Sequence, residues 1–131
     1  MSSFTDYTEN LALTYLFNTG SVTRPTAWFV GLFTAAPSDT GGGTEVSGSG
    51  YSRISAGTIS GSGTATTFTN AAAIEFGAAS GGDWGTIGWA AIFDASTGGN
   101  MLAWAPLTTA KAINDGDIFR IPASSLSITL S

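Results

Sequence analysis

The chain has 131 residues and a net charge of −5, and only 10% of its residues are charged, against roughly 25% in an average domain. Its four cations, Arg24, Arg53, Lys111 and Arg120, are scattered along the sequence, which argues against a basic surface for nucleic acid or for an anionic membrane. The absence of cysteine and histidine excludes disulfides, thiol catalysis, the Ser-His-Asp triad and most zinc sites.

The first predicted element is a helix over residues 3–18. Apolar side chains recur at helical spacing in this segment: Phe4, Tyr7, Leu11 and Tyr15, widened by Leu16 and Phe17. Ser3 followed by Asp6 resembles a capping box, and Gly20 suits a helix exit. This helix could cover one face of the strand predicted at 26–35.

From residue 26 onward the pattern changes to short strands separated by turns. Residues 26–35 and 86–95 are apolar on both faces, which is typical of strands covered from both sides. Further strands are expected in 51–60, 64–76, 101–109 and 125–131, with turns at 96–100 and 114–117. The pattern predicts one domain over 1–131 that is mainly β. It would be an antiparallel β-sandwich (jelly-roll-like or an open barrel) over 26–131, preceded by one N-terminal α-helix.

A glycine-rich stretch over 36–50 is expected to be a long loop between two strands. It contains Asp39-Thr40-Gly41, the active-site triplet of aspartic proteases. Those enzymes need two aspartates that share a proton in a dry site, whereas the flanking residues here favour a turn in water. The following glycines also lack the lysine of a phosphate-binding loop. We therefore expect no catalytic residue in this loop.

Metal binding is equally weakly indicated. Asp39 and Glu45 share one loop, and Asp115 and Asp117 lie in the sequence NDGD, but no glutamate follows at the spacing of a calcium loop. We interpret the NDGD sequence as a β-turn. We expect the chain to bind no metal and no cofactor.

Four tryptophans, together with Tyr51, could in principle form a platform for a carbohydrate. Three of them lie inside predicted strands and are expected in the core: Trp28, Trp89 and Trp104. Trp84 follows a GGD sequence in a loop, so Asp83 and Trp84 are the candidates for surface recognition.

Nearly the whole chain resembles a family of small virion proteins of tailed bacteriophages, commonly labelled tail fibre proteins. The most specific segments are VGLFTAAPSDTGGGTEVSGSGYSR and IFDASTGGNMLAW. The resemblance implies a structural protein on the exterior of the phage particle, made in the cytoplasm of the bacterial host. Its partners would be the major capsid protein or tail proteins. A homo-oligomer is also implied, and a trimer is one form that phage symmetry allows.

The sequence has no heptad run and no shaft repeat. We therefore expect a non-enzymatic capsid decoration (cement) protein that stabilises the assembled shell. The alternative is a tail fibre or tail-tip component that recognises a host surface. The expected interface residues come from the helix and the loop: Phe4, Tyr7, Asp39, Thr40, Gly41, Gly42, Gly43, Thr44, Glu45 and Tyr51. Removal of residues 38–48 is expected to leave the domain folded.

Overall fold

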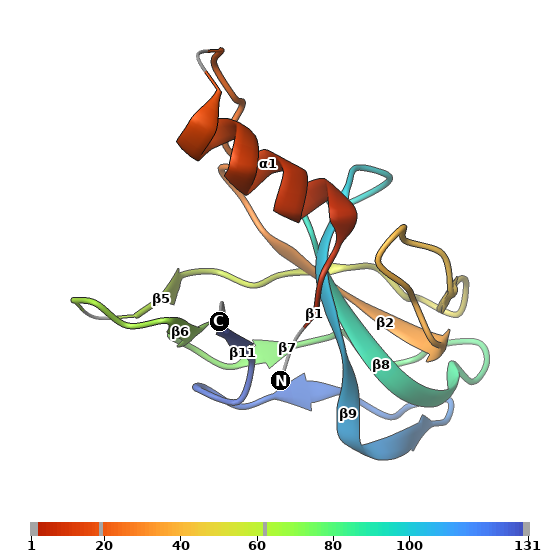
Figure 1. Cartoon of the computed structure of the whole chain (residues 1–131). Helices are drawn as coiled ribbons and strands as arrows, with labels where there is room; N and C mark the ends of the chain where they lie inside the picture. Colours follow the sequence, from red (N-terminus) through yellow and green to blue (C-terminus); the bar gives the residue numbers. More distant parts are fainter. Residues whose placement is uncertain (1–2, 19, 62, 130–131) are drawn as a thin grey trace.

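The computed structural model describes residues 3–18, 20–61 and 63–129 (Figure 1). One helix, α1 (Asp6–Phe17), is followed by short antiparallel strands, so the predicted mainly β fold with an N-terminal helix is confirmed. The strands are β1 (Ser3–Phe4), β2 (Phe29–Ala35), β3 (Thr44–Glu45), β4 (Ile54–Ser55), β5 (Ile59–Ser60), β6 (Thr67–Asn70), β7 (Ile74–Glu75), β8 (Gly85–Phe93), β9 (Met101–Ile113), β10 (Arg120–Ile121) and β11 (Ser127–Thr129).

The largest sheet has six strands in the order β1-β9-β8-β2-β3, with β4 also paired to β2. Strands β8 and β9 form the predicted hairpin around residues 96–100. The turn at 114–117 is also confirmed, because the Asp117 amide donates to the Asn114 carbonyl at 2.8 Å. This sheet is the platform on which the other elements lie.

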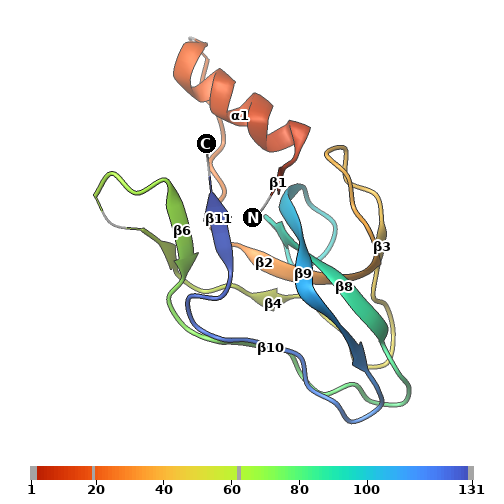
Figure 2. The same ribbon diagram turned by 60° about the horizontal axis from the view of Figure 1, so that its bottom comes forward.

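A second layer packs across one face of the large sheet (Figure 2). It consists of a two-stranded sheet, β10-β7, and a three-stranded sheet, β11-β6-β5. The main core lies between the layers and consists of Val30, Leu32, Val46, Ala56, Ile74, Phe76, Ala79, Trp84, Ile87, Ile113, Phe119 and Ile121. Two antiparallel layers around one core are consistent with the predicted sandwich.

Strand β2 is covered on both faces, as its unbroken apolar sequence predicted. Val30 and Leu32 point into the main core, whereas Phe33 belongs to a smaller cluster on the opposite face. That second cluster also contains Ala91, Phe93 and Met101, with Trp89 and Trp104 packed against it. Trp28, Trp89 and Trp104 are thus half-buried rather than fully enclosed, but they pack against apolar clusters as expected.

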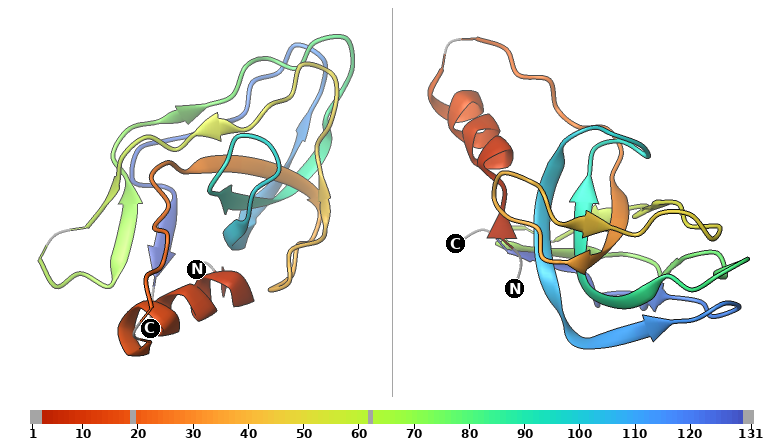
Figure 3. Two further views of the ribbon diagram at one scale, coloured as in Figure 1. Left: turned by 90° about the horizontal axis from the view of Figure 1, so that it is seen from above. Right: turned by 90° about the vertical axis from the view of Figure 1, so that its right-hand side faces the viewer.

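The helix differs from the prediction in its bounds and its packing. Residues 3–4 form strand β1, which pairs with β9, and the N-cap is Thr5 rather than Ser3. No residue of α1 is buried and none belongs to the cluster around Phe33, so α1 is not the element that covers the second face of β2. Figure 3 shows that α1 projects from one end of the strands. In the described part of the chain, no helix is long and apolar enough to span a membrane.

Candidate functional site

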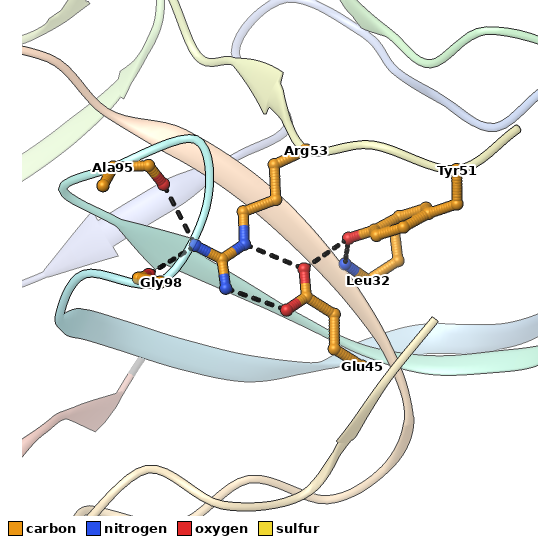
Figure 4. Close-up of polar contacts among 6 residues, drawn as sticks. All are labelled: Leu32, Glu45, Tyr51, Arg53, Ala95 and Gly98. Atoms are coloured by element: carbon orange, nitrogen blue, oxygen red, sulfur yellow. Dashed lines mark hydrogen bonds and ion pairs between the residues drawn. The ribbon is translucent and has the colours of Figure 1, made fainter. Parts of the chain in front are cut away.

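A polar cluster joins four segments next to the second face of the large sheet: β2, β3, residues 51–53 and the loop between β8 and β9 (Figure 4). Arg53 donates from Nε to Glu45 Oε2 and from Nη2 to Glu45 Oε1, both at 2.9 Å. Its Nη1 donates to the carbonyls of Ala95 and Gly98, at 3.0 and 2.8 Å. Arg53 therefore ties the loop between β8 and β9 to strand β3.

The cluster has little capacity left for a ligand. The guanidinium carbon of Arg53 lies 3.4 Å from the centre of the Phe93 ring, so one face of its plane is covered. The Tyr51 hydroxyl donates to Glu45 Oε2 at 2.7 Å and accepts the Leu32 amide at 2.9 Å. Burial raises the pKa of Tyr51 well above its ordinary value, and the hydrogen bond to Glu45 adds to the increase. We call Glu45, Tyr51 and Arg53, held together by these contacts, the Arg53 clamp, and we interpret it as structural.

The Gly-rich segment 36–50 is more structured than the prediction of a long loop. Ser38 and Gly41 exchange backbone hydrogen bonds of 2.7 and 2.9 Å around a tight turn, and β3 then pairs with β2. Gly41, Gly42 and Gly43 have φ angles of 95°, 74° and 76°, a conformation that other residues rarely adopt. A Cβ at Gly43 would also lie 2.8 Å from the Ala35 carbonyl oxygen. Backbone geometry therefore accounts for the three glycines.

The turn at Asp39 contacts the beginning of helix α1. The Asp6 amide donates to the Asp39 carbonyl at 2.8 Å, and the Trp104 indole donates to Asp39 Oδ1 at 3.4 Å. Thr5 is buried, and its hydroxyl donates to the Met101 carbonyl at 2.6 Å. The Thr8 hydroxyl donates to the Leu102 carbonyl at 2.7 Å. These bonds fix the first turn of α1 to the sheet.

Most of the predicted interface residues come together in one place. A cleft of about 410 Å³ is lined by Tyr7, Asp39, Thr40, Gly41, Gly42, Gly43 and Glu45, together with Arg53 and residues of the β8–β9 hairpin. Thr44 and Tyr51 do not line it, and Phe4 lines a different groove. Whether these residues contact a partner stays a prediction.

Three acidic residues line the cleft: Asp6, Asp39 and Glu45. Asp6 and Asp39 are exposed, and Glu45 is bound by Arg53 in an ion pair. Within residues 3–18, 20–61 and 63–129, no three acidic, histidine or cysteine side chains are grouped as metal ligands. The local contacts of Asp39 fit the interpretation of a turn.

The expected surface role of Trp84 is wrong. Its side chain is only 5% exposed and lies in the main core, where its ring meets Tyr51 edge-on at 5.3 Å. The indole donates to the Ser49 carbonyl at 3.0 Å, which satisfies its one polar atom. The preceding glycines suggested an exposed loop, but the chain turns inward at Trp84. Asp83 is exposed and accepts the Asp115 amide at 2.8 Å.

The deletion expectation also changes with the structure. Residues 38–48 contain β3 and Glu45, the carboxylate partner of Arg53. They also contain Val46, which is buried in the main core. Removal of this segment is therefore expected to unfold the domain, not to leave it intact.

Helix α1 carries the largest group of exposed apolar side chains. Leu13, Tyr15, Leu16 and Phe17 are 58%, 72%, 65% and 80% exposed, and Tyr7 is 40% exposed. Tyr15, Leu16 and Phe17 belong to the apolar stripe predicted from the sequence, whereas Leu13 was not part of that stripe. The sequence did contain a signal for this exposed apolar surface. Apolar residues occur on more than one side of the helix, which is typical of a helix enclosed by protein.

An apolar groove of about 550 Å³ lies between α1, the segment before β2 and the two layers of strands. Its walls include Phe4, Thr8, Leu11, Arg24, Pro25, Trp28, Ile59, Phe68, Ile92, Leu102, Ala103 and Ile128. Ile92 pairs in register with Val30 and with Ala103, so the groove continues the face that forms the main core. The core is thus open at the end that carries α1.

Comparison with known proteins supports a virion protein. A search of curated proteins found no match. A family model described as "Podophage GP4 fiber I protein gp80" matches residues 3–129, nearly the whole chain. The predicted resemblance to small phage virion proteins is confirmed, and the chain belongs to this family of phage fibre proteins.

Proposed function

We propose that this protein is a non-enzymatic structural subunit of a fibre on the phage exterior, and that it is built into the particle through helix α1. The observation that carries the proposal is the exposure of Leu13, Leu16 and Phe17 on a helix without a single buried residue. The family match to a fibre protein supports the same assignment.

The physical argument concerns the stability of α1. A helix of 12 residues is marginal in water by itself, and most helices in proteins are stabilised by burying an apolar face. Here the first turn is anchored to β9 through Thr5 and Thr8, and to the turn at Asp39 through the amide of Asp6. Full burial of each leucine or phenylalanine side chain contributes roughly 1.5–3 kcal/mol. Coverage of the exposed side chains by a neighbouring subunit would therefore stabilise both the helix and the assembly.

A capsid decoration protein is the second candidate. It is favoured by the arrangement of the described residues, in which short strands pack as one block and no elongated repeat provides a shaft. In that case α1 would contact the major capsid protein. In the fibre assignment it would contact other fibre or tail subunits.

Immunogold electron microscopy of intact virions with an antibody against this chain tests the location. Gold on fibres supports the main proposal, and gold spread over the head supports the decoration candidate. An absence of gold from intact virions would contradict both assignments.

The route of incorporation needs a second experiment. A phage that encodes the substitution Leu16→Asp should contain much less of this chain in purified particles, whereas the substitution Ile118→Asp should not change its amount. Ile118 is a matched control because it is also apolar and 47% exposed, but it lies near β10 rather than on α1. Equal incorporation of both variants would contradict a role for α1.

A further inference from the structure

Helix α1 presents apolar side chains in two directions. Thr8 and Leu11 face the molecule's own apolar groove. With 3.6 residues per turn, Leu13, Leu16 and Phe17 lie on the other side of the helix, at the i, i+3 and i+4 spacing of one stripe. We call these three residues the outer stripe. Thr8 and Leu11 already line a groove of their own chain, whereas all three residues of the outer stripe are more than half exposed. The outer stripe is therefore the set that we expect to need a partner.

The apolar groove is the complementary feature. Several of its lining side chains are only partly buried, and Phe68 is 43% exposed although it is a large apolar residue. The groove's volume of about 550 Å³ lies within the range of roughly 300–1,000 Å³ that is typical of binding pockets. Such a pocket can receive a few apolar side chains from a projecting helix.

Charge favours a second copy of this chain as the occupant. Arg24 lines the groove, is exposed and makes no ion pair within the described residues, where Arg53–Glu45 is the one salt bridge. Helix α1 has two acids, Asp6 and Glu9, and no basic residue. Glu9 lies one turn before Leu13 and is exposed on the same side of the helix. A helix from a second copy would thus bring a carboxylate and an apolar stripe to a groove that offers a cation and an apolar lining.

We propose that the outer stripe of one copy inserts into the apolar groove of a second copy, with Glu9 facing Arg24. The inference names the partner of α1, and so rests on the proposed function. The contact joins two different surfaces, so its repetition closes into a ring or continues as a filament, depending on the rotation between copies. Either form suits a subunit of a fibre.

Analytical ultracentrifugation of the purified full chain over a dilution series tests the contact. The unmodified chain should self-associate. The substitutions Leu16→Asp in the outer stripe and Phe68→Asp in the groove should each raise the dissociation constant at least about tenfold, as expected for central interface residues. Ile118→Asp, the control, should leave it unchanged. A chain that is monomeric at every concentration, or association unaffected by Leu16→Asp, would overturn the proposal.

A mixing experiment tests the pairing of the two surfaces. The Leu16→Asp chain keeps an intact groove, and the Phe68→Asp chain keeps an intact helix. An equimolar mixture should therefore form a complex at a concentration at which each variant alone is monomeric. No complex in the mixture would show that the stripe and the groove are not partners. Circular dichroism checks that both variants fold, and Phe68→Ser replaces Phe68→Asp if the latter does not.

Charge reversal gives a test that does not alter the apolar surfaces. Glu9→Arg and Arg24→Glu should each weaken association about two- to fivefold, and the double variant should restore it, as expected for an exposed ion pair. Failure of the double variant to recover would rule out the Glu9–Arg24 contact. If the chain is monomeric but Leu16→Asp still prevents incorporation into virions, the proposed function holds and the second copy is the wrong partner.

Discussion

The Arg53 clamp and helix α1 lie at opposite extremes of packing in the same small chain. The guanidinium of Arg53 donates hydrogen bonds to Glu45 from one edge and to two carbonyls from another, and the Phe93 ring covers one of its faces. Helix α1 is bonded to the sheet at its first turn, while Leu16 and Phe17 remain 65% and 80% exposed. The clamp completes its interactions within the chain, whereas the helix leaves most of its apolar surface in water.

The two regions should therefore affect different properties: the Arg53 clamp and the core affect stability, and helix α1 affects assembly. Side chains around the clamp and the main core should determine whether the domain folds, because their removal leaves cavities or unpaired polar groups. Side chains of the outer stripe should have little effect on folding of the isolated chain, because they contact few of its other residues. The predictions below test this separation, starting with the largest expected effect on stability.

Trp84→Ala is expected to lower the free energy of unfolding by about 3–5 kcal/mol, because it leaves a large cavity among Tyr51, Phe76 and the rest of the main core. Urea denaturation monitored by circular dichroism measures the change. Phe17→Ala is the control, since that ring is 80% exposed and its loss should cost less than about 0.5 kcal/mol. Similar losses for the two variants would contradict the separation.

Arg53→Ala is expected to lower the free energy of unfolding by about 2–4 kcal/mol, somewhat less than for a fully buried pair because the Glu45 side chain is 24% exposed. The loss comes mainly from leaving the Glu45 carboxylate and the two carbonyls without their donor. Arg53→Lys keeps the charge but cannot form the two parallel bonds, so its stability should be intermediate. A lysine variant as stable as the original chain would show that charge alone is sufficient.

The Tyr51 hydroxyl should make the clamp sensitive to alkali. Its pKa in the folded chain is raised above the ordinary value of 10.0, so the folded state retains the proton when the unfolded state loses it. The contribution to stability is full below pH 10 and declines as the pH rises toward the folded pKa, by up to about 1.4 kcal/mol per pH unit. Chemical denaturation between pH 8 and about 11.5 should show this decline. The slope should be shallower in Tyr51→Phe, and identical slopes would argue against the shift.

Leu16→Asp should have the smallest effect on the isolated domain, within about 0.5 kcal/mol, because Leu16 is a largely exposed side chain. The same variant is expected to lose incorporation into virions. Thermal unfolding of a dilute sample, in which self-association is absent, measures the first quantity, and quantitative immunoblotting of purified particles measures the second. A drop of several kcal/mol would mean that the outer stripe belongs to the core of the single chain.

Local patterns in the sequence were enough to predict the class of fold and several of its elements. The unbroken apolar runs at 26–35 and 86–95 correspond to β2 and β8, because a strand covered on both faces needs apolar side chains at successive positions. The turns at 96–100 and 114–117 followed from glycine and aspartate, which favour tight turns.

Only the tertiary structure decided which side chains have partners. Trp84 and Leu16 are both apolar. The sequence suggested an exposed loop for Trp84, which is wrong, and it placed Leu16 on an apolar helical stripe without deciding what that stripe contacts. Trp84 is buried because the chain after its glycines turns into the core, and Leu16 is exposed because α1 is anchored by its first turn alone. Glu45 and Arg53 are eight residues apart, but their pairing depends on how β3 and the β8–β9 hairpin meet. Composition and periodicity report what a segment can bury, whereas long-range contacts determine what it does bury.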